Sequence, residues 1–317
     1  MALQDTERRQ GLLGGRRGSA RTNTQRENRA GLALISPTAV IVGLVVFVPL
    51  VWAISMAFQP VTLINIRGVG IFGEYTLDNF REVLSSSGFA SSLWTTLIYT
   101  VGSTGGSLLV GLIAALALRR SFRGRALVRG LVLLPYVAPV VAVTFVWTTM
   151  LDPQFGIVNY WGQKLFGWDE GIAFLSQKST ALATVIVFEI WRYFPFAFLF
   201  LMARLQAVPH DIEEAAVVDG ATPWQQFRFV LLPQLVSTLA VLFLLRSIFT
   251  FNKFDDVFLL TGGGSGTEVV SVRVYEFLIA RKDVGAASAQ AVVLALIMVI
   301  FILIQMRVMR GHTEEQD

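Results

Sequence analysis

The stretch PHDIEEAAVVDGATPWQQFRFVLLP, from Pro209 to Pro233, is a polar and acidic segment between two long apolar runs of the chain. Its first half, DIEEAAVV, predicts a short helix that is capped by Asp211. Glu213 and Glu214 fall in the first turn of this helix, where the helix dipole favours carboxylates. The segment is therefore predicted to be folded rather than a loose connection.

A second helix is predicted shortly after the first. Gly220 ends the first helix, and Thr222 followed by Pro223 is typical of an N-cap with proline at the first helical position. The two helices and the turn between them are therefore predicted to form a helix-turn-helix at a membrane surface. It could rest on lipid as an amphipathic connector, but lipid-bound helices usually present Lys and Arg, whereas this one presents acidic residues that include Asp219. A protein partner is favoured.

The composition of the whole chain indicates a bilayer environment. Of 317 residues 54% are hydrophobic and 15% charged, and the mean hydropathy is +0.61, too apolar for a soluble domain of this length. There is no cysteine and there are only two histidines, His210 and His312, so neither disulfides nor a histidine-rich metal site is expected. The pI near 9.6 does not indicate nucleic-acid binding, because the arginines lie beside apolar runs.

Six apolar segments are long enough to cross a membrane, which takes about 20 residues of helix. They run approximately from Leu32 to Phe58, Leu93 to Leu118, Val128 to Leu151, Ala181 to Met202, Val230 to Phe254 and Ala286 to Val308. The first is too long for the apolar part of a signal peptide. Glycines and prolines in the second and third spans allow close packing and kinks within membranes. The predicted fold class is an all-α polytopic bundle of six transmembrane helices.

Arginine distribution predicts the orientation of the bundle, because cytoplasmic segments are enriched in Lys and Arg. Arginines concentrate before the first span, in the second connection RRSFRGRALVR, and after the last span. Both termini and the stretch 209–233 are therefore predicted to be cytoplasmic. The predicted parts are a disordered basic tail (1–31), a six-helix permease domain (32–308) and a cytoplasmic tail (309–317), with outer connections at 59–92, 152–180 and 255–283.

The spacing of the opening stretch resembles a known motif. Glu214-Ala215-Ala216, Gly220 four residues later, and Val230-Leu231-Leu232-Pro233 after nine more are similar to the EAA loop of permease subunits of binding-protein-dependent ABC importers. The resemblance implies the type I importer fold and a coupling helix that fits a cleft of a cytoplasmic ATPase subunit. The ATPase-coupling residues it implies are Glu213, Glu214, Ala215, Ala216, Asp219, Gly220 and Pro233.

Further stretches resemble carbohydrate permeases of the maltose and glycerol-phosphate type, in the first-subunit branch. They are PTAVIVGLVVFVPLVWAISMAF, TLDNFREVL, GIVNYWGQKLFG, LQAVPHDIEEAAVVDGA, FDDVFLLTGGGSGTE and VGAASAQAVV. Ser265 stands where the family often has proline. The resemblance implies a sugar substrate, with glycerol phosphate or another small polar solute as the alternative. The TGGG run from Thr261 to Gly264 is either a flexible turn or part of a binding-protein interface.

The chain lacks the residues of a catalyst. There is no G-x-x-x-x-G-K-[ST] phosphate loop and no nucleophile elbow, so no catalytic residues, metal site or bound cofactor are expected. The resemblance implies that ATP and Mg²⁺ bind to two separate ATPase subunits. The other implied partners are a second permease, giving a heterodimer, and an extracytoplasmic solute-binding protein, all at a bacterial cell membrane. An ion-coupled secondary transporter would show inverted repeats, and a channel a filter ring, which are not evident.

Charged residues within the spans are candidates for the translocation pathway, because charge at membrane depth is costly and normally faces a cavity or a partner. Glu189, Arg192 and Arg246 either form an ion pair between helices or contact sugar directly. Aromatic residues nearby either stack on sugar rings or pack the bundle. The candidate pathway residues are Glu189, Trp191, Arg192, Tyr193, Arg246, Phe249 and Asn252.

Overall fold

The computed structural model describes residues 31–313, and the side chains up to Arg307. Most of the predicted basic tail and the last residues of the chain lie outside this range. A helix that begins at Gly31 continues through η1 (Gly43–Phe47) and α3 (Val48–Ala57). The elements that follow are η2 (Ile66–Gly68), α4 (Asp78–Ser85), α5 (Phe89–Ala117), α6 (Arg125–Val137), α7 (Val140–Met150), α8 (Ile157–Phe166), α9 (Ala181–Gln206), α10 (His210–Val218), α11 (Pro223–Gln225), η3 (Gln226–Leu231), α12 (Leu232–Phe251), α13 (Asp255–Thr261), α14 (Val270–Tyr275), η4 (Glu276–Ala280) and α15 (Val284–Thr313). Within the described range no strand forms, and one isolated bridge joins Thr62 and Asp283.

Among residues 31–313, five helices are long and apolar enough to span a membrane, and a sixth span is present if the pair α6 and α7 counts as one. The prediction of one helix from Val128 to Leu151 is wrong. These two helices meet at an angle of 94°, and the chain between them, Ala138 and Pro139, is extended. The cause is Pro139, because a proline ring disfavours helical geometry in the residue before it. The other proline, Pro135, lies inside α6 without breaking it.

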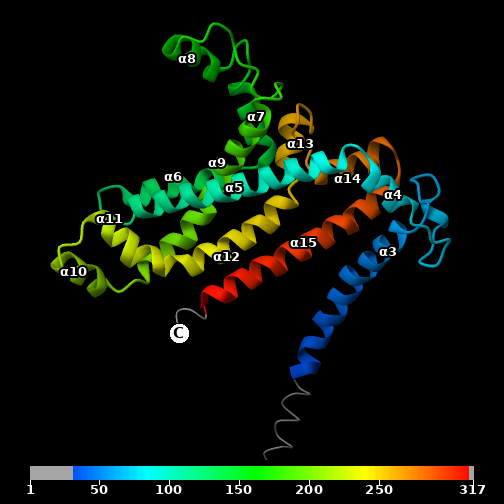
Figure 1. Cartoon of the computed structure of the whole chain (residues 1–317), viewed down its shortest axis with the longest axis horizontal. Coiled ribbons are helices and arrows are strands. Elements are labelled where there is room, and N and C mark those ends of the chain that lie inside the picture. The colour runs from blue at the N-terminus through cyan, green and yellow to red at the C-terminus, as the bar shows by residue number, and fades with distance from the viewer. Residues whose placement is uncertain (1–30, 314–317) are drawn as a thin grey trace, which may run out of the picture.

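The centre of the bundle is the contact between α5 and α9 (Figure 1). Glycines on α5 let the two backbones approach closely: a Cβ atom at Gly111 would lie 2.6 Å from Ala197 Cβ and 2.9 Å from the Phe194 carbonyl oxygen. Buried residues of α12, such as Leu235, complete the core there. Close packing of small residues replaces the hydrophobic driving force that is absent between helices in lipid.

The remaining elements lie around this centre. In Figure 1, α10 and α11 lie at the left end of the bundle and α4 and α14 lie toward the right, whereas α13 lies above the middle and α8 projects upward beyond α7. The first helix is largely exposed along its length and contacts α15 through α3. Its apolar surface is what a lipid-facing helix requires.

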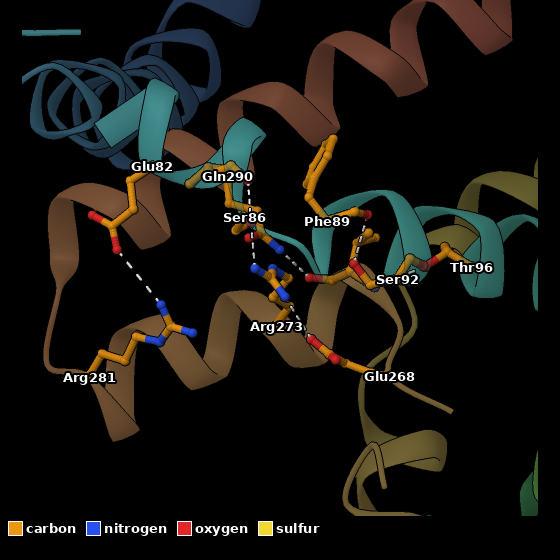
Figure 2. A network of polar contacts seen from close by, with 11 residues as sticks. Glu82, Ser86, Phe89, Ser92, Thr96, Glu268, Arg273, Arg281 and Gln290 are labelled. Atoms are coloured by element: carbon orange, nitrogen blue, oxygen red, sulfur yellow. Dashed lines mark hydrogen bonds and ion pairs between the residues drawn. The ribbon is translucent and has the colours of Figure 1, made fainter. Parts of the chain in front are cut away.

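Polar contacts join the elements at the end opposite α10 (Figure 2). The buried Arg273 of α14 donates to Ser86 Oγ at 2.6 Å and to Glu268 Oε1 at 3.2 Å. The Val270 amide donates to Thr96 Oγ1, and Gln290 Nε2 donates to the Val270 carbonyl, both at 2.9 Å. These bonds connect α14 to α5 and α15 across long sequence separations. The bond to Thr96 also satisfies the amide of Val270, which begins α14 and therefore has no acceptor within its own helix.

Candidate functional site

The helix-turn-helix of the opening stretch is formed by α10, α11 and η3. Gly220 adopts φ +77°, a left-handed conformation that L side chains rarely adopt, and this turn ends α10 as predicted. Thr222 and Gln225 form a reciprocal capping box that starts the second helix, which confirms the predicted cap with Pro223 at its first position. The turn is thus fixed by local interactions.

The predicted capping role of Asp211 is wrong. The helix starts one residue earlier, at His210, after an extended Pro209, and no side chain caps it. Proline favours the extended conformation that a cap residue needs, so the helix begins directly after it. Asp211 lies in the first turn, where its charge still meets the helix dipole favourably.

The two neighbouring glutamates of α10 have different surroundings. The Glu214 side chain is 71% exposed, and its Oε1 atom lies 3.8 Å from His210 Nδ1. The Glu213 side chain is 17% exposed and accepts a hydrogen bond from Arg119 Nη2, just beyond the end of α5. Burial lowers the pKa of Arg119, and the charge of Arg120 lowers it further, but an arginine remains protonated at neutral pH. The sequence did not predict this pair.

An open groove of about 1120 Å³ lies between α10 and the connection from α5 to α6. Its lining includes Arg119, Glu213, Glu214 and Phe227. Ala215, Asp219 and Pro233 are exposed, and Ala216 is half-buried. The predicted coupling residues from Glu214 to Gly220 therefore lie on α10 and the turn that ends it, whereas Pro233 lies beyond η3 in the first turn of α12 and the charge of Glu213 is directed toward the bundle.

A second cluster lies inside the bundle, where α9 meets α12. Arg246 Nη2 donates to Glu189 Oε1 at 2.9 Å, and the two side chains are 4% and 0% exposed. The ion pair between helices, one of the two predicted alternatives, is thus confirmed. The Arg246 guanidinium also lies 4.1 Å from the centre of the Tyr193 ring, a cation–π contact.

Lys253, just beyond α12, extends this cluster. Its amine donates to the Tyr193 hydroxyl at 2.6 Å and lies 3.4 Å from Asp256 Oδ2. Asp256 is fully buried at the start of α13. Arg246 and Lys253 therefore each have a carboxylate partner, which is the condition under which charge is tolerated at such depth. The buried Arg192 beside Tyr193 has no ion-pair partner among the described residues.

Beside these charges is a cavity of about 250 Å³. It is lined by Tyr136, Tyr193, Phe196, Arg246, Phe249 and Lys253. Aromatic faces and a few polar donors are the surroundings that sugar-sized ligands require. The cavity therefore lies where α6, α9 and α12 come together.

Of the predicted pathway residues, Tyr193, Arg246 and Phe249 line this cavity, and Glu189 lies behind it as the partner of Arg246. The others lie elsewhere. Trp191 packs on the Trp147 ring at 5.5 Å, Arg192 is buried beside Tyr193, and Asn252 is exposed and bonds to the Ile248 carbonyl.

Tyr136, Phe196, Lys253 and Asp256 were missed as site residues. Phe196 lies three residues beyond Tyr193 on α9, a spacing that places both on one face, and this signal could have identified it. Tyr136 gave no such signal, because its position depends on the bend after α6.

The fold and these two surfaces define a polytopic helical membrane protein with a polar cavity inside the bundle and an exposed turn at one end. The chain belongs to the family described as "Binding-protein-dependent transport system inner membrane component", whose model matches residues 107–312. The matched region contains both surfaces. The predicted family and its type I importer fold are therefore confirmed.

Similar proteins agree with this assignment. The chain is 36% identical over 277 residues to "Inner membrane ABC transporter permease protein YcjO" of Escherichia coli K12, covering 86% of this chain and 92% of that protein. It is 31% identical over 268 residues to "Trehalose transport system permease protein SugA" of Mycobacterium tuberculosis, covering 84% of each. It is 29% identical over 288 residues to "Trehalose/maltose transport system permease protein MalF" of Thermococcus litoralis, covering 90% and 95%.

A solved structure shares the fold over most of the chain. It is described as a bacterial ABC transporter involved in the import of the acidic polysaccharide alginate. The similarity has a TM-score of 0.79 at 22% identity and covers 91% of this chain and 98% of that one. At this identity it establishes the fold alone.

Proposed function

We propose that this chain is the permease subunit of an ATP-driven ABC importer in a bacterial cell membrane and that it translocates a mono- or oligosaccharide. An extracytoplasmic binding protein delivers the sugar. A second, related permease completes the pathway as a heterodimer, and two cytoplasmic ATPase subunits bind ATP and Mg²⁺. This chain holds no cofactor and performs no catalysis itself.

The observation that carries the proposal is the exposed turn between α10 and η3. Gly220 and the capping box fix its shape, while Glu214 and Ala215 remain accessible. A rigid, exposed surface is what a partner needs in order to push on the bundle. We infer that ATP-driven closure of the ATPase pair displaces α10, and that the bundle then changes from inward-facing to outward-facing.

The sugar class is supported by two observations. Relatives that are 29–31% identical are named as trehalose or trehalose/maltose permeases. The cavity beside Tyr193 offers aromatic faces for sugar rings, with Arg246 and Lys253 as hydrogen-bond donors. Glycerol phosphate is the second candidate, because those two cations could bind a phosphate. Sugar is favoured because both cations already pair with carboxylates.

Reconstituted transport tests the proposal. The chain is assembled with its second permease and ATPase subunits in liposomes, and uptake of trehalose, maltose and glycerol 3-phosphate is measured with the binding protein present. We expect uptake of a sugar that requires both ATP and the binding protein. Uptake without ATP that stops when ion gradients are collapsed would instead establish an ion-coupled secondary transporter. Preference for glycerol phosphate would replace the substrate class and keep the importer.

A further inference from the structure

Helix α10 has little apolar attachment to the bundle. None of its nine residues is fully buried, and Ile212, Val217 and Val218 are exposed. It is joined to α9 by the short link from Ala207 to Pro209 and to η3 through the turn at Gly220. Both attachments lead along the chain to α9 and α12. Apolar packing therefore does not explain how α10 would move any other helix.

The ion pair between Arg119 and Glu213 supplies a connection to a different part of the bundle. In the described residues it is the one ion pair, and the one side-chain hydrogen bond, that links α10 to another element. The two residues are 94 positions apart, and both side chains are largely shielded from solvent. A shielded pair is less screened by water and salt than an exposed one.

Arg119 itself is held in a fixed frame. Arg129 Nη2 donates to the Leu118 carbonyl at 2.8 Å, and Arg125 Nη1 donates to the Arg119 carbonyl at 3.4 Å. Both donors belong to α6 and both acceptors follow the end of α5. The corner between α5 and α6 is thus bonded to itself, and Arg119 extends from it toward α10.

We propose that Arg119 is a positioning residue whose ion pair with Glu213 makes α10 and the corner between α5 and α6 move as one body. A push on α10 would then reach α5 and α6 directly, in addition to α9 and α12. This inference rests on the proposed function, and it gives the two glutamates separate tasks: Glu214 faces the ATPase subunit and Glu213 holds α10 to the bundle.

The route beyond the corner leads to the interior. Tyr136, at the far end of α6, lines the cavity beside Arg246. The buried face of α5 carries hydroxyl groups, among them Thr100 and Ser103, close to α9 and α12. Both helices therefore connect the ion pair to the region where substrate is proposed to pass, and a rigid helix transmits displacement along its length.

Charge reversal tests the pair in the reconstituted importer. The variants are R119E, E213R and the exchange R119E/E213R, with R123E as a matched control because Arg123 lies exposed in the same connection. For each single variant we expect roughly 5- to 10-fold less sugar taken up per ATP hydrolysed. This factor lies at the lower end of the range that typical coupling free energies produce. The exchange should recover most of this loss, and R123E should equal the parent.

A covalent link tests the same idea in a way that does not depend on charge. The chain has no cysteine, so the variant R119C/E213C can be joined selectively by a flexible bismaleimide. It should lose coupling when unlinked and regain it when linked, since the link replaces the ion pair.

Two results would overturn the inference: single reversals that couple like the parent, or a link that fails to restore uptake in a complex that still assembles and hydrolyses ATP. Failure of the proposed function is distinguishable, because it would appear as absence of ATP-dependent uptake in the parent.

Discussion

Removing the charge of Arg246 should destabilise the bundle through the carboxylate that is left behind. Arg246 and Glu189 are both almost completely buried, and one hydrogen bond of 2.9 Å joins them. Lys253, the other cation nearby, lies 3.4 Å from Asp256 and has that carboxylate as its ion-pair partner. Breaking a buried pair by removing one member costs about 3–5 kcal/mol, so we expect Arg246→Ala to lower the free energy of unfolding by that amount.

A second variant, Glu189→Gln, distinguishes the cost of an unpaired buried charge from the cost of lost side-chain packing. Glu189→Gln alone leaves Arg246 with a weaker acceptor and should cost about 1–3 kcal/mol. In the double variant no unpaired charge remains, so the loss should be no larger than that of Arg246→Ala alone. The single losses would sum to about 4–8 kcal/mol, so the coupling energy should be about 1 kcal/mol or more.

The assay is reversible unfolding of the purified chain in detergent, with Arg67→Ala as the control because Arg67 is exposed. The control should change the free energy of unfolding by about 0.5 kcal/mol or less. Strict additivity of the two single variants would refute the argument, as would a loss below about 1 kcal/mol for Arg246→Ala. A variant of normal stability that hydrolyses ATP but transports poorly would instead assign Arg246 to substrate contact.

Three other outcomes follow from the structure. Gly220→Val should reduce substrate-stimulated ATP hydrolysis in the assembled complex far more than Gly220→Asn, since asparagine tolerates positive φ and a Cβ there meets no neighbour; equal activity of the two would contradict the backbone argument. A cysteine in place of Ser265 should react with an impermeant thiol reagent on intact cells, whereas one in place of Ser121 should not, and the opposite pattern would invert the topology. Arg273→Ala should cost about 3–5 kcal/mol in detergent unfolding, against under about 1 kcal/mol for Arg281→Ala, whose side chain is 52% exposed; similar losses would argue against a structural role for the buried arginine.

Local features of the coupling turn were predictable from sequence because they depend on neighbouring residues. Gly220 and the cap at Thr222 act within a few positions, and both were confirmed. The start of α10 was misplaced by one residue because a cap could be assigned to Asp211 without knowing that Pro209 is extended.

The break between α6 and α7 shows a limit of hydropathy. A window of apolar residues measures how well a segment dissolves in lipid and gives no information about its direction. Pro139 indicated a kink, but a kink and a bend of 94° have the same composition. Tyr136 could not be placed for this reason, since its contact with the cavity depends on the path of the chain around that bend.

The sequence could not decide which charged residues pair with each other, because the partners are far apart along the chain. Glu189 and Arg246 were identified as buried charges because both lie in apolar runs, and their pairing was one alternative. Glu213 was assigned to a partner protein because nothing local distinguishes it from Glu214. Its inward direction results from Arg119, which is 94 residues away.

The two ion pairs, taken with the packing of α5, suggest how one displacement could affect the whole bundle. Helix α9 leads through a short link into α10, and it carries Glu189 and Tyr193 at the cavity. Helix α5 reaches α10 from the other side through Arg119. At Gly111 these two helices are too close for even a methyl group, so neither can shift across the other without separating. A push on α10 would therefore move α5 and α9 together, and the cavity would change at its contacts with α6 and α12, where α6 can turn about the extended residues before α7.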